Sequence, residues 1–285
     1  VLLILSVLLF CSGPSYPSVR GPEVWLISAQ PENYFPAFFE IHLKRLLPPS
    51  QLQSINLYSN HTGELSRNIN LNISFARVII LMDFSSELAD TFFQECQKII
   101  FSEKPLLIAW NCDLKNLPQF FEIIPLIINW DPVFETLKIF LPDQSLPIFL
   151  IHQQENYVQT FFQSLQNNFP NPIMMTSSVV AHQPSPQQSI YIVSNDRLMK
   201  EFLPSLHPLI YLESSTLALT EIQAGHLSAA LDLKPSQLAA QIPQLLKDVL
   251  SLPVITLTPH LILAHNLSEA DSYEAYRRCF MCTNQ

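Results

Sequence analysis

Residues 217–265 read LALTEIQAGHLSAALDLKPSQLAAQIPQLLKDVLSLPVITLTPHLILAH, and this stretch decides the fold. Its first part completes a predicted helix over Ser215–Gln223 that stops at Gly225, because glycine readily adopts the left-handed backbone that ends helices. An apolar strand over Leu227–Leu231 follows. A long helix is predicted over Pro235–Leu250, with a proline in its first turn. Strand and helix therefore alternate, which indicates an α/β protein.

The same alternation extends toward the N-terminus. Short apolar runs are separated by segments with apolar residues at helical spacing. The predicted strands are Val24–Ser28, Ser54–Tyr58, Arg77–Met82, Pro105–Trp110, Leu146–His152, Ile173–Thr176, Ile190–Val193 and Leu209–Leu212, with Leu261–Leu263 as the last one. The other predicted helices are Phe35–Leu47, Ser85–Ile100, Tyr157–Phe169 and Asp196–Leu203. Fully apolar strands between amphipathic helices are typical of parallel sheets covered on both faces.

A break at Asn111–Pro118 separates two such series of strands and helices. We therefore expect two Rossmann-like lobes with parallel sheets, joined by a hinge. In sheets of this kind a ligand binds outside the carboxyl ends of the strands, and here that place lies between the lobes.

The N-terminal residues predict export. Val1–Cys11 is an apolar run of 11 residues, whereas a membrane-spanning helix needs about 20. Small and turn-forming residues follow it, so we interpret residues 1–20 as a signal peptide; a buried N-terminal strand is the alternative. Cys11 stands where a lipidated cysteine would stand, although Phe10 precedes it. The expected location is the periplasm, with lipidation through Cys11 left open.

Composition argues against several functions. The net charge is −9 and only 14% of residues are charged, which makes nucleic acid a poor partner. Four glycines provide no glycine-rich phosphate loop. The sequence contains no GxSxG or HExxH motif, so we expect no enzyme, no cofactor and no metal site. Cys279 and Cys282 form a CxxC pair for which a local disulfide stays open.

The order of motifs resembles the type I periplasmic binding proteins, the family of ribose- and galactose-binding receptors that includes the effector domain of lac-type repressors. Residues 217–265 are similar to its C-terminal signature, Ser194–Met199 to its "x-N-D-x-M-A" motif, and Asn33–Phe35 to its "N-P-F-F" motif. The resemblance implies two discontinuous lobes. Their predicted bounds are 22–113 plus 233–258 for the N-terminal lobe and 114–232 plus 259–285 for the C-terminal lobe.

The resemblance also implies a ligand site between the lobes. Aromatic faces would stack on a sugar ring, and amides and carboxylates would bond its hydroxyls. Carried over by position, the ligand-binding candidates are Asn33, Phe35, Trp110, Asn111, Asn156, Asn195, Asp196, Glu213 and Asp232. Asn33 and Asp196 have an alternative role as helix N-caps, and Trp110 an alternative place in the core.

The expected function is capture of a small, sugar-like ligand for an ABC permease. The alternative is a receptor of the same fold that signals to a membrane kinase or cyclase. The family's Asp-Arg pair after the strand Pro105–Trp110 is replaced here by Asn111-Cys112, a departure that favours sensing. An exported hydrolase is a third candidate, but no nucleophile–base pair supports it.

Overall fold

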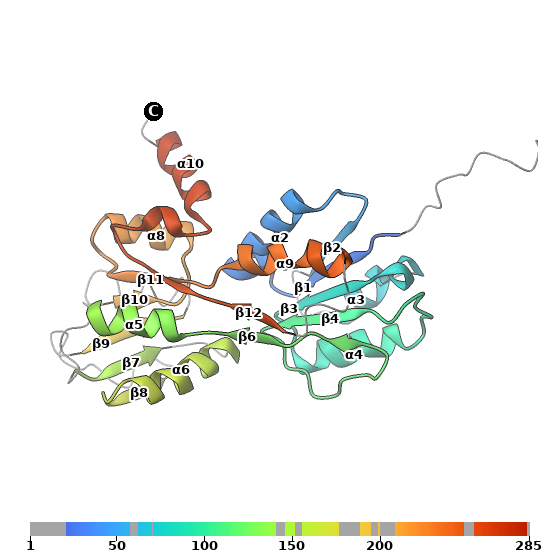
Figure 1. Ribbon diagram of the computed structural model, residues 1–285, viewed down its shortest axis with the longest axis horizontal. Helices are drawn as coiled ribbons and strands as arrows, with labels where there is room; N and C mark the ends of the chain where they lie inside the picture. Colours follow the sequence, from blue (N-terminus) through green and yellow to red (C-terminus); the bar gives the residue numbers. More distant parts are fainter. Residues whose placement is uncertain are drawn as a thin grey trace, which may run out of the picture.

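A computed structural model of the chain describes residues 21–57, 62–69, 71–140, 146–151, 156–176, 189–194, 199, 209–247 and 254–283. These residues form two α/β lobes that lie side by side along the long axis of the molecule (Figure 1). The predicted α/β architecture with two lobes is confirmed. Among the described helices, none combines the length and the apolar character needed to cross a membrane.

The first lobe contains a parallel sheet in the order β2-β1-β3-β4-β5. Its strands are β1 (Val24–Ser28), β2 (Leu52–Asn56), β3 (Val78–Met82), β4 (Leu106–Trp110) and β5 (Glu122–Ile123). Side chains alternate along β1, so that Val24 and Leu26 enter one core while Trp25 and Ile27 enter the other. One face is covered by α2 (Tyr34–Leu46) and α9 (Pro235–Lys247), and the other by α3 (Thr62–Asn68), η1 (Leu71–Phe75) and α4 (Ser86–Cys96).

The second lobe contains a sheet in the order β8-β7-β9-β10-β11-β13. Its strands are β7 (Ile148–Ile151), β8 (Ile173–Thr176), β9 (Ile190–Val193), β10 (Leu209–Tyr211), β11 (Ala229–Asp232) and β13 (His260–Ile262). Only β13 is antiparallel to its neighbour. The covering helices are α5 (Asp131–Phe140) and α6 (Asn156–Asn168) on one face and α8 (Thr216–Gln223) and α10 (Tyr273–Thr283) on the other, with η3 (Leu267–Glu269) before α10.

Both sheets place the first strand of the unit between the second and the third. The direction in which successive strands are added to the sheet therefore reverses at β1/β3 in the first lobe and at β7/β9 in the second. Ligands of open α/β sheets bind at this reversal, outside the carboxyl ends of the strands. The topology thus directs attention to the residues that follow β1 and β3.

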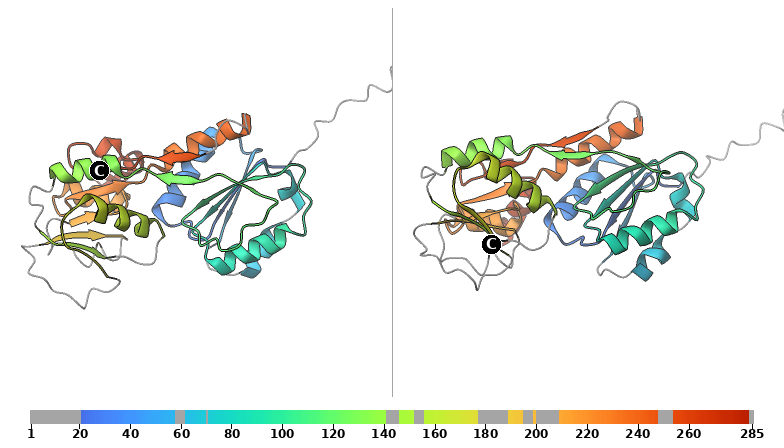
Figure 2. Two further views of the ribbon diagram at one scale, coloured as in Figure 1. Left: turned by 60° about the horizontal axis from the view of Figure 1, so that its bottom comes forward. Right: turned by 90° about the horizontal axis from the view of Figure 1, so that it is seen from below.

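The lobes are joined by a two-stranded ribbon of β6 (Leu126–Ile128) and β12 (Ile255–Leu257), which are parallel. Figures 1 and 2 show this ribbon running between the lobes, with α9 beside it. A further crossing leads from β11 in the second lobe to α9, which packs against α2 of the first. One hydrophobic core continues through both lobes and includes Ile255 and Leu257 of the ribbon.

Local signals predicted several boundaries correctly. Ser85 and Ser215 cap α4 and α8, accepting hydrogen bonds from the backbone N–H groups of Leu88 and Ala218. Gly225 has φ +78°, as expected for a residue that ends a helix. The ribbon strands and the helices α3, α5 and α10 were not predicted. Three predicted features lie outside the described residues. They are the leader over residues 1–20, the helix Asp196–Leu203 apart from Met199, and the side chains of Cys279 and Cys282.

Candidate functional site

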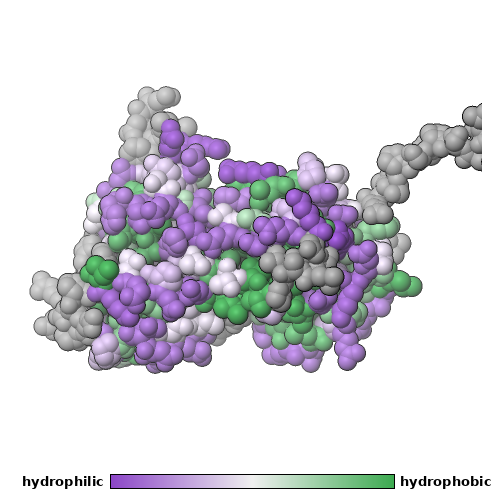
Figure 3. All heavy atoms as spheres, in the orientation of Figure 1, coloured by the Kyte–Doolittle hydropathy of each residue, from purple (hydrophilic) through white to green (hydrophobic). Residues whose placement is uncertain are grey.

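A cavity of about 400 Å³ lies between the lobes. The first lobe contributes the end of β4, the ribbon contributes β6, and the second lobe contributes one side of α6. Its lining residues are Ala109, Trp110, Asn111, Cys112, Leu126, Ile127, Ile128, Trp130, Tyr157, Thr160 and Ser164. Figure 3 shows hydrophobic side chains gathered at the middle of the molecule, where the lobes meet. The cavity therefore lies where the topology places a ligand.

A cluster of three polar side chains occupies the reversal point of the first sheet. The Asn33 amide donates to Asp83 Oδ2 over 3.1 Å, and the Asn111 amide donates to Asp83 Oδ1 over 2.6 Å. Asn33 is the N-cap residue of α2, yet its side chain makes no capping bond and instead reaches Asp83 and Gln30. The structure thus brings together the predicted residues Asn33 and Asn111 around a carboxylate that the sequence analysis missed.

Asp83 is held in an unusual state. Its φ is 59° and that of Asn111 is 52°, a left-handed backbone that non-glycine residues rarely adopt and that tertiary contacts must maintain. Asp83 is 8% exposed. Burial raises its pKa to about 6, against the opposing effect of the bonds from Asn111 and Asn33. The position of Asp83 directly after the apolar strand β3 was the sequence feature from which this site residue could have been predicted.

Three aromatic rings join the lobes beside the cavity. The rings of Phe35 and Trp110 are stacked with their centroids 3.8 Å apart and an interplanar angle of 11°. Tyr157 of α6 approaches Trp110 from the second lobe at 5.9 Å and 22°. A separation of 3.8 Å leaves no space for a sugar ring between Phe35 and Trp110. The predicted aromatic residues are therefore together, but Phe35 packs on Trp110, and Trp110 is the one that lines the cavity.

Glu213 follows β10 on the side of the second lobe that faces this stack. Its carboxylate accepts hydrogen bonds from the hydroxyls of Tyr157 over 3.4 Å and Tyr211 over 3.2 Å. Glu213 thus contacts a residue of the cavity wall through Tyr157. Asn156 is the first residue of α6, with its side chain outside the described set, and Asn195 and Asp196 lie outside the described residues.

Asp232 lies away from the cavity lining, in a buried cluster at the crossing from β11 to α9. It is fully buried, and Oδ1 accepts bonds from the Tyr34 hydroxyl at 2.8 Å and the Lys234 amide at 3.0 Å. Oδ2 accepts a bond from the Asp271 amide at 2.8 Å and lies 3.1 Å from Lys234 Nζ. Both oxygens are therefore engaged by the protein. We call Tyr34, Ser214, Asp232, Lys234 and Asp271 the hinge cluster.

Asp271 connects the hinge cluster to the start of α9. Its carboxylate accepts bonds from the Ser236 amide at 2.7 Å and the Ser236 hydroxyl at 2.8 Å. Burial and the nearby charge of Asp232 raise the pKa of Asp271. His42 Nε2 of α2 lies 3.9 Å from Asp271 Oδ2, and burial lowers the pKa of this histidine. The cluster is therefore a structural junction of α2, α9 and the segment before α10.

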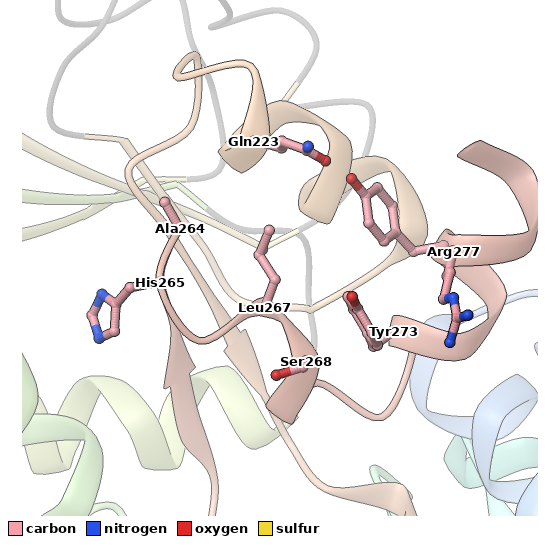
Figure 4. A pocket seen from close by; sticks show the side chains of 8 residues that line it. Gln223, Ala264, His265, Leu267, Ser268, Tyr273 and Arg277 are labelled. Carbon is pink, nitrogen blue, oxygen red and sulfur yellow. The ribbon is translucent and has the colours of Figure 1, made fainter. Parts of the chain in front are cut away.

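A second cavity of about 400 Å³ lies on the second lobe, among the end of α8, η3 and α10. Figure 4 shows that its polar side chains do not converge: His265 points away from the others, Arg277 lies on the opposite side, and Leu267 lies between them. Within the described part of the chain, no group of three or more His, Cys, Asp or Glu side chains is placed to hold a metal ion. The cavity between the lobes is the better candidate site.

No protein-family model matches the sequence, and no curated protein matches it. Solved structures do match. The myo-inositol binding protein of Caulobacter, bound to myo-inositol, is 15% identical with a TM-score of 0.58, covering 91% of this chain and 98% of that one. The periplasmic binding protein of the arabinose ABC transporter from Shewanella sp. ANA-3, bound to L-arabinofuranose, is 12% identical with a TM-score of 0.61, covering 92% and 98%.

The chain has the type I periplasmic binding protein fold. The XylFII–LytSN complex also matches, at 12% identity and a TM-score of 0.58, covering 86% of this chain and 99% of that one. In the periplasmic binding protein fold of this chain, the polar cluster around Asp83 and the wall that contains Trp110 stand at the edge where the two lobes face each other.

Proposed function

We propose that this chain is an exported solute-binding protein that holds a small, polar, sugar-like ligand between its lobes. The observation that carries the proposal is Asp83, bonded by Asn33 and Asn111 at the reversal point of the first sheet, next to a cavity that residues of both lobes line. A carboxylate has about four acceptor sites, more than two amide bonds occupy, so Asp83 has capacity to accept bonds from ligand hydroxyls.

The shape of the site agrees with such a ligand. Thr160 and Ser164 provide hydroxyls on the side of α6, and Trp110 and Trp130 border the cavity with the small part of their surface, 3% and 5%, that stays exposed. Proteins of the same fold bind myo-inositol and L-arabinofuranose. With this function we propose the predicted lobe bounds, 22–113 plus 233–258 and 114–232 plus 259–285, with one change: the first boundary moves past β5 (Glu122–Ile123), which pairs with β4 in the first sheet. The packing of α9 on α2 supports the first of them.

A screen of neutral polyols and sugars tests the proposal. Myo-inositol, L-arabinose, D-ribose, D-glucose, D-galactose and their phenyl glycosides would be tested by thermal shift and then by titration calorimetry. We expect at least one compound to raise the melting temperature, and Asp83→Ala to weaken its binding at least tenfold. Asp113→Ala is the matched control, since Asp113 follows the neighbouring strand β4 and pairs with Lys115 on the surface. The proposal fails if no compound of the panel binds.

A sensing role is the second candidate. The XylFII–LytSN complex shows that a chain of this fold assembles with a second protein. We propose an ABC permease as the partner for transport and a membrane sensor as the partner for signalling. Genes for a permease and an ATPase beside this one would support transport, whereas an adjacent sensor-kinase gene would support signalling.

A further inference from the structure

The cavity between the lobes has a neutral lining. None of the described residues that line it is acidic or basic. Cys112 does not change this, because burial raises the pKa of its thiol to about 12. A negatively charged group placed in the cavity would lose water, meet no opposite charge on these walls and lie near the Asp83 carboxylate that Asn111 contacts, which costs several kcal/mol.

One wall of the cavity is apolar. It consists of the three residues of β6, Leu126, Ile127 and Ile128, together with Trp130. Ile127 is 51% exposed, so the protein leaves about half of this large apolar side chain uncovered at the edge of the cavity. Covering such a surface with an apolar part of a ligand is favourable.

The hydrogen-bonding groups lie apart from this wall. Asn111 is at the end of β4, and Thr160 and Ser164 are on α6. The Thr160 hydroxyl donates to the carbonyl of Tyr157 over 2.8 Å, and its oxygen can still accept a bond. The cavity thus presents hydroxyl-binding groups on one side and hydrocarbon on the other.

We propose that the ligand of this cavity is amphipathic and carries no negative charge, with a hydroxyl-bearing ring near Asn111 and α6 and an apolar substituent against β6. A glycoside with an apolar aglycone has this chemistry, and a free sugar has only half of it. The inference rests on the proposed function and narrows the class of ligand.

The test compares matched compounds by titration calorimetry on the full chain. For glucose and for galactose, the free sugar, the phenyl β-glycoside and the uronate would be measured. We expect the phenyl glycoside to bind about tenfold more tightly than the free sugar, because burying a few additional carbon atoms has about that effect. We expect no measurable binding of the uronate.

Two isoleucines provide the variant and its control. Ile127→Ser removes apolar surface from the cavity, whereas Ile123→Ser changes a residue that is 40% exposed on β5 and does not line the cavity. Ile127→Ser should abolish the advantage of the phenyl glycoside over the free sugar, while Ile123→Ser should change the affinity for neither compound. Their exposure makes both substitutions compatible with folding, which a melting curve checks.

The outcomes separate the two proposals. If free sugars or inositol bind but the phenyl glycoside gains nothing, or if a uronate binds as well as its neutral parent, the inference is overturned and the proposed function stands. An advantage that survives Ile127→Ser also overturns the inference. If no neutral compound binds, both proposals fail.

Discussion

The hydroxyl of Tyr34, at the start of α2, donates a hydrogen bond of 2.8 Å to Oδ1 of Asp232 at the end of β11. The two residues are 198 positions apart and belong to elements of different lobes. Ser214, in the loop after β10, donates to the same hydroxyl over 2.6 Å. Burial and the charge of Asp232 raise the pKa of Tyr34 well above 10.0, so the phenol stays protonated. This bond fixes the second lobe to the first beside the hinge ribbon.

Replacing Tyr34 with phenylalanine tests the strength of this connection. The change removes one donor from the buried Asp232 carboxylate, and we expect it to lower the free energy of unfolding by about 1–3 kcal/mol. Urea denaturation followed by circular dichroism measures the loss. Tyr273→Phe is the control, because the ring of this half-buried tyrosine contacts Tyr276 while its hydroxyl has no hydrogen-bond partner among the described residues. Equal losses for the two variants would contradict the prediction.

Lys234→Met should have a larger effect. Lys234 Nζ lies 3.1 Å from Asp232 Oδ2, and the two side chains are 10% and 0% exposed. Without the ammonium group the buried carboxylate has no nearby cation, and about 3–5 kcal/mol of stability should be lost. Lys98→Met removes an exposed ion pair with Glu95 and should cost less than about 1 kcal/mol.

A double variant distinguishes loss of the ion pair from loss of packing. In Asp232→Asn/Lys234→Met the fully buried carboxylate is removed together with its cation and only Asp271, 3.8 Å from Lys234 Nζ, loses a cation, so the double variant should be more stable than Lys234→Met alone. If it is less stable, the cost of Lys234→Met does not come from the unpaired carboxylate.

Asp83 predicts a pH dependence of stability. Its pKa is about 6 in the folded protein, against 3.8 as the ordinary value, so the folded state binds the proton more tightly than the unfolded chain. The stabilising contribution is complete below pH 3.8 and is lost as the pH rises through 6. The loss is about 3 kcal/mol, at 1.36 kcal/mol per pKa unit.

The Asp83→Asn variant isolates this contribution, because an amide does not titrate in this range. The free energy of unfolding of the wild type minus that of the variant should fall by about 2.4 kcal/mol between pH 4 and pH 7. A constant difference for Asp83→Asn would show that burial does not raise the pKa of this group.

Trp110 should contribute both to stability and to binding. It is 3% exposed and stacked between Phe35 and Tyr157. Trp110→Ala should lower the free energy of unfolding by about 3–5 kcal/mol, and Trp110→Phe should recover most of that loss, because a ring of similar shape remains. Urea denaturation measures both. Similar losses for the two variants would mean that the stack itself is not the source of the stability.

The sequence predicted the elements whose signal is local. The strands Val24–Ser28, Ile173–Thr176 and Ile190–Val193 are found with the predicted bounds, because continuous apolar runs between turn residues define buried strands. β6 and β12 were missed, since three-residue strands carry no periodicity and their pairing joins residues more than 120 positions apart. β13 was predicted as a strand, but its antiparallel direction depends on the ribbon that precedes it.

The candidate site divides in the same way. Positions at the ends of strands were readable, and Asn33, Trp110 and Asn111 do meet at the edge between the lobes. The contacts of these side chains could not be predicted from the sequence. The Asn33 side chain could cap its helix or bond Asp83, and the outcome depends on the position of the neighbouring strand β3. Asp232 stands at a strand end like Glu213, yet the chain turns at Lys234 and surrounds its carboxylate with donors from α2 and the segment before α10.

Residues 217–265 by themselves determined the α/β fold class. The spacing of apolar residues, a glycine after a helix and a proline in the first turn of a helix are local properties of the chain, and they do not depend on tertiary contacts. Two of the structure's central features were decided only in three dimensions. These features are the aromatic stack of Phe35, Trp110 and Tyr157 and the burial of Asp232, and both depend on which distant segments pack together. Because such segments surround Asp232 completely, its carboxylate stabilises the junction between the lobes, whereas Asp83 lies next to the cavity.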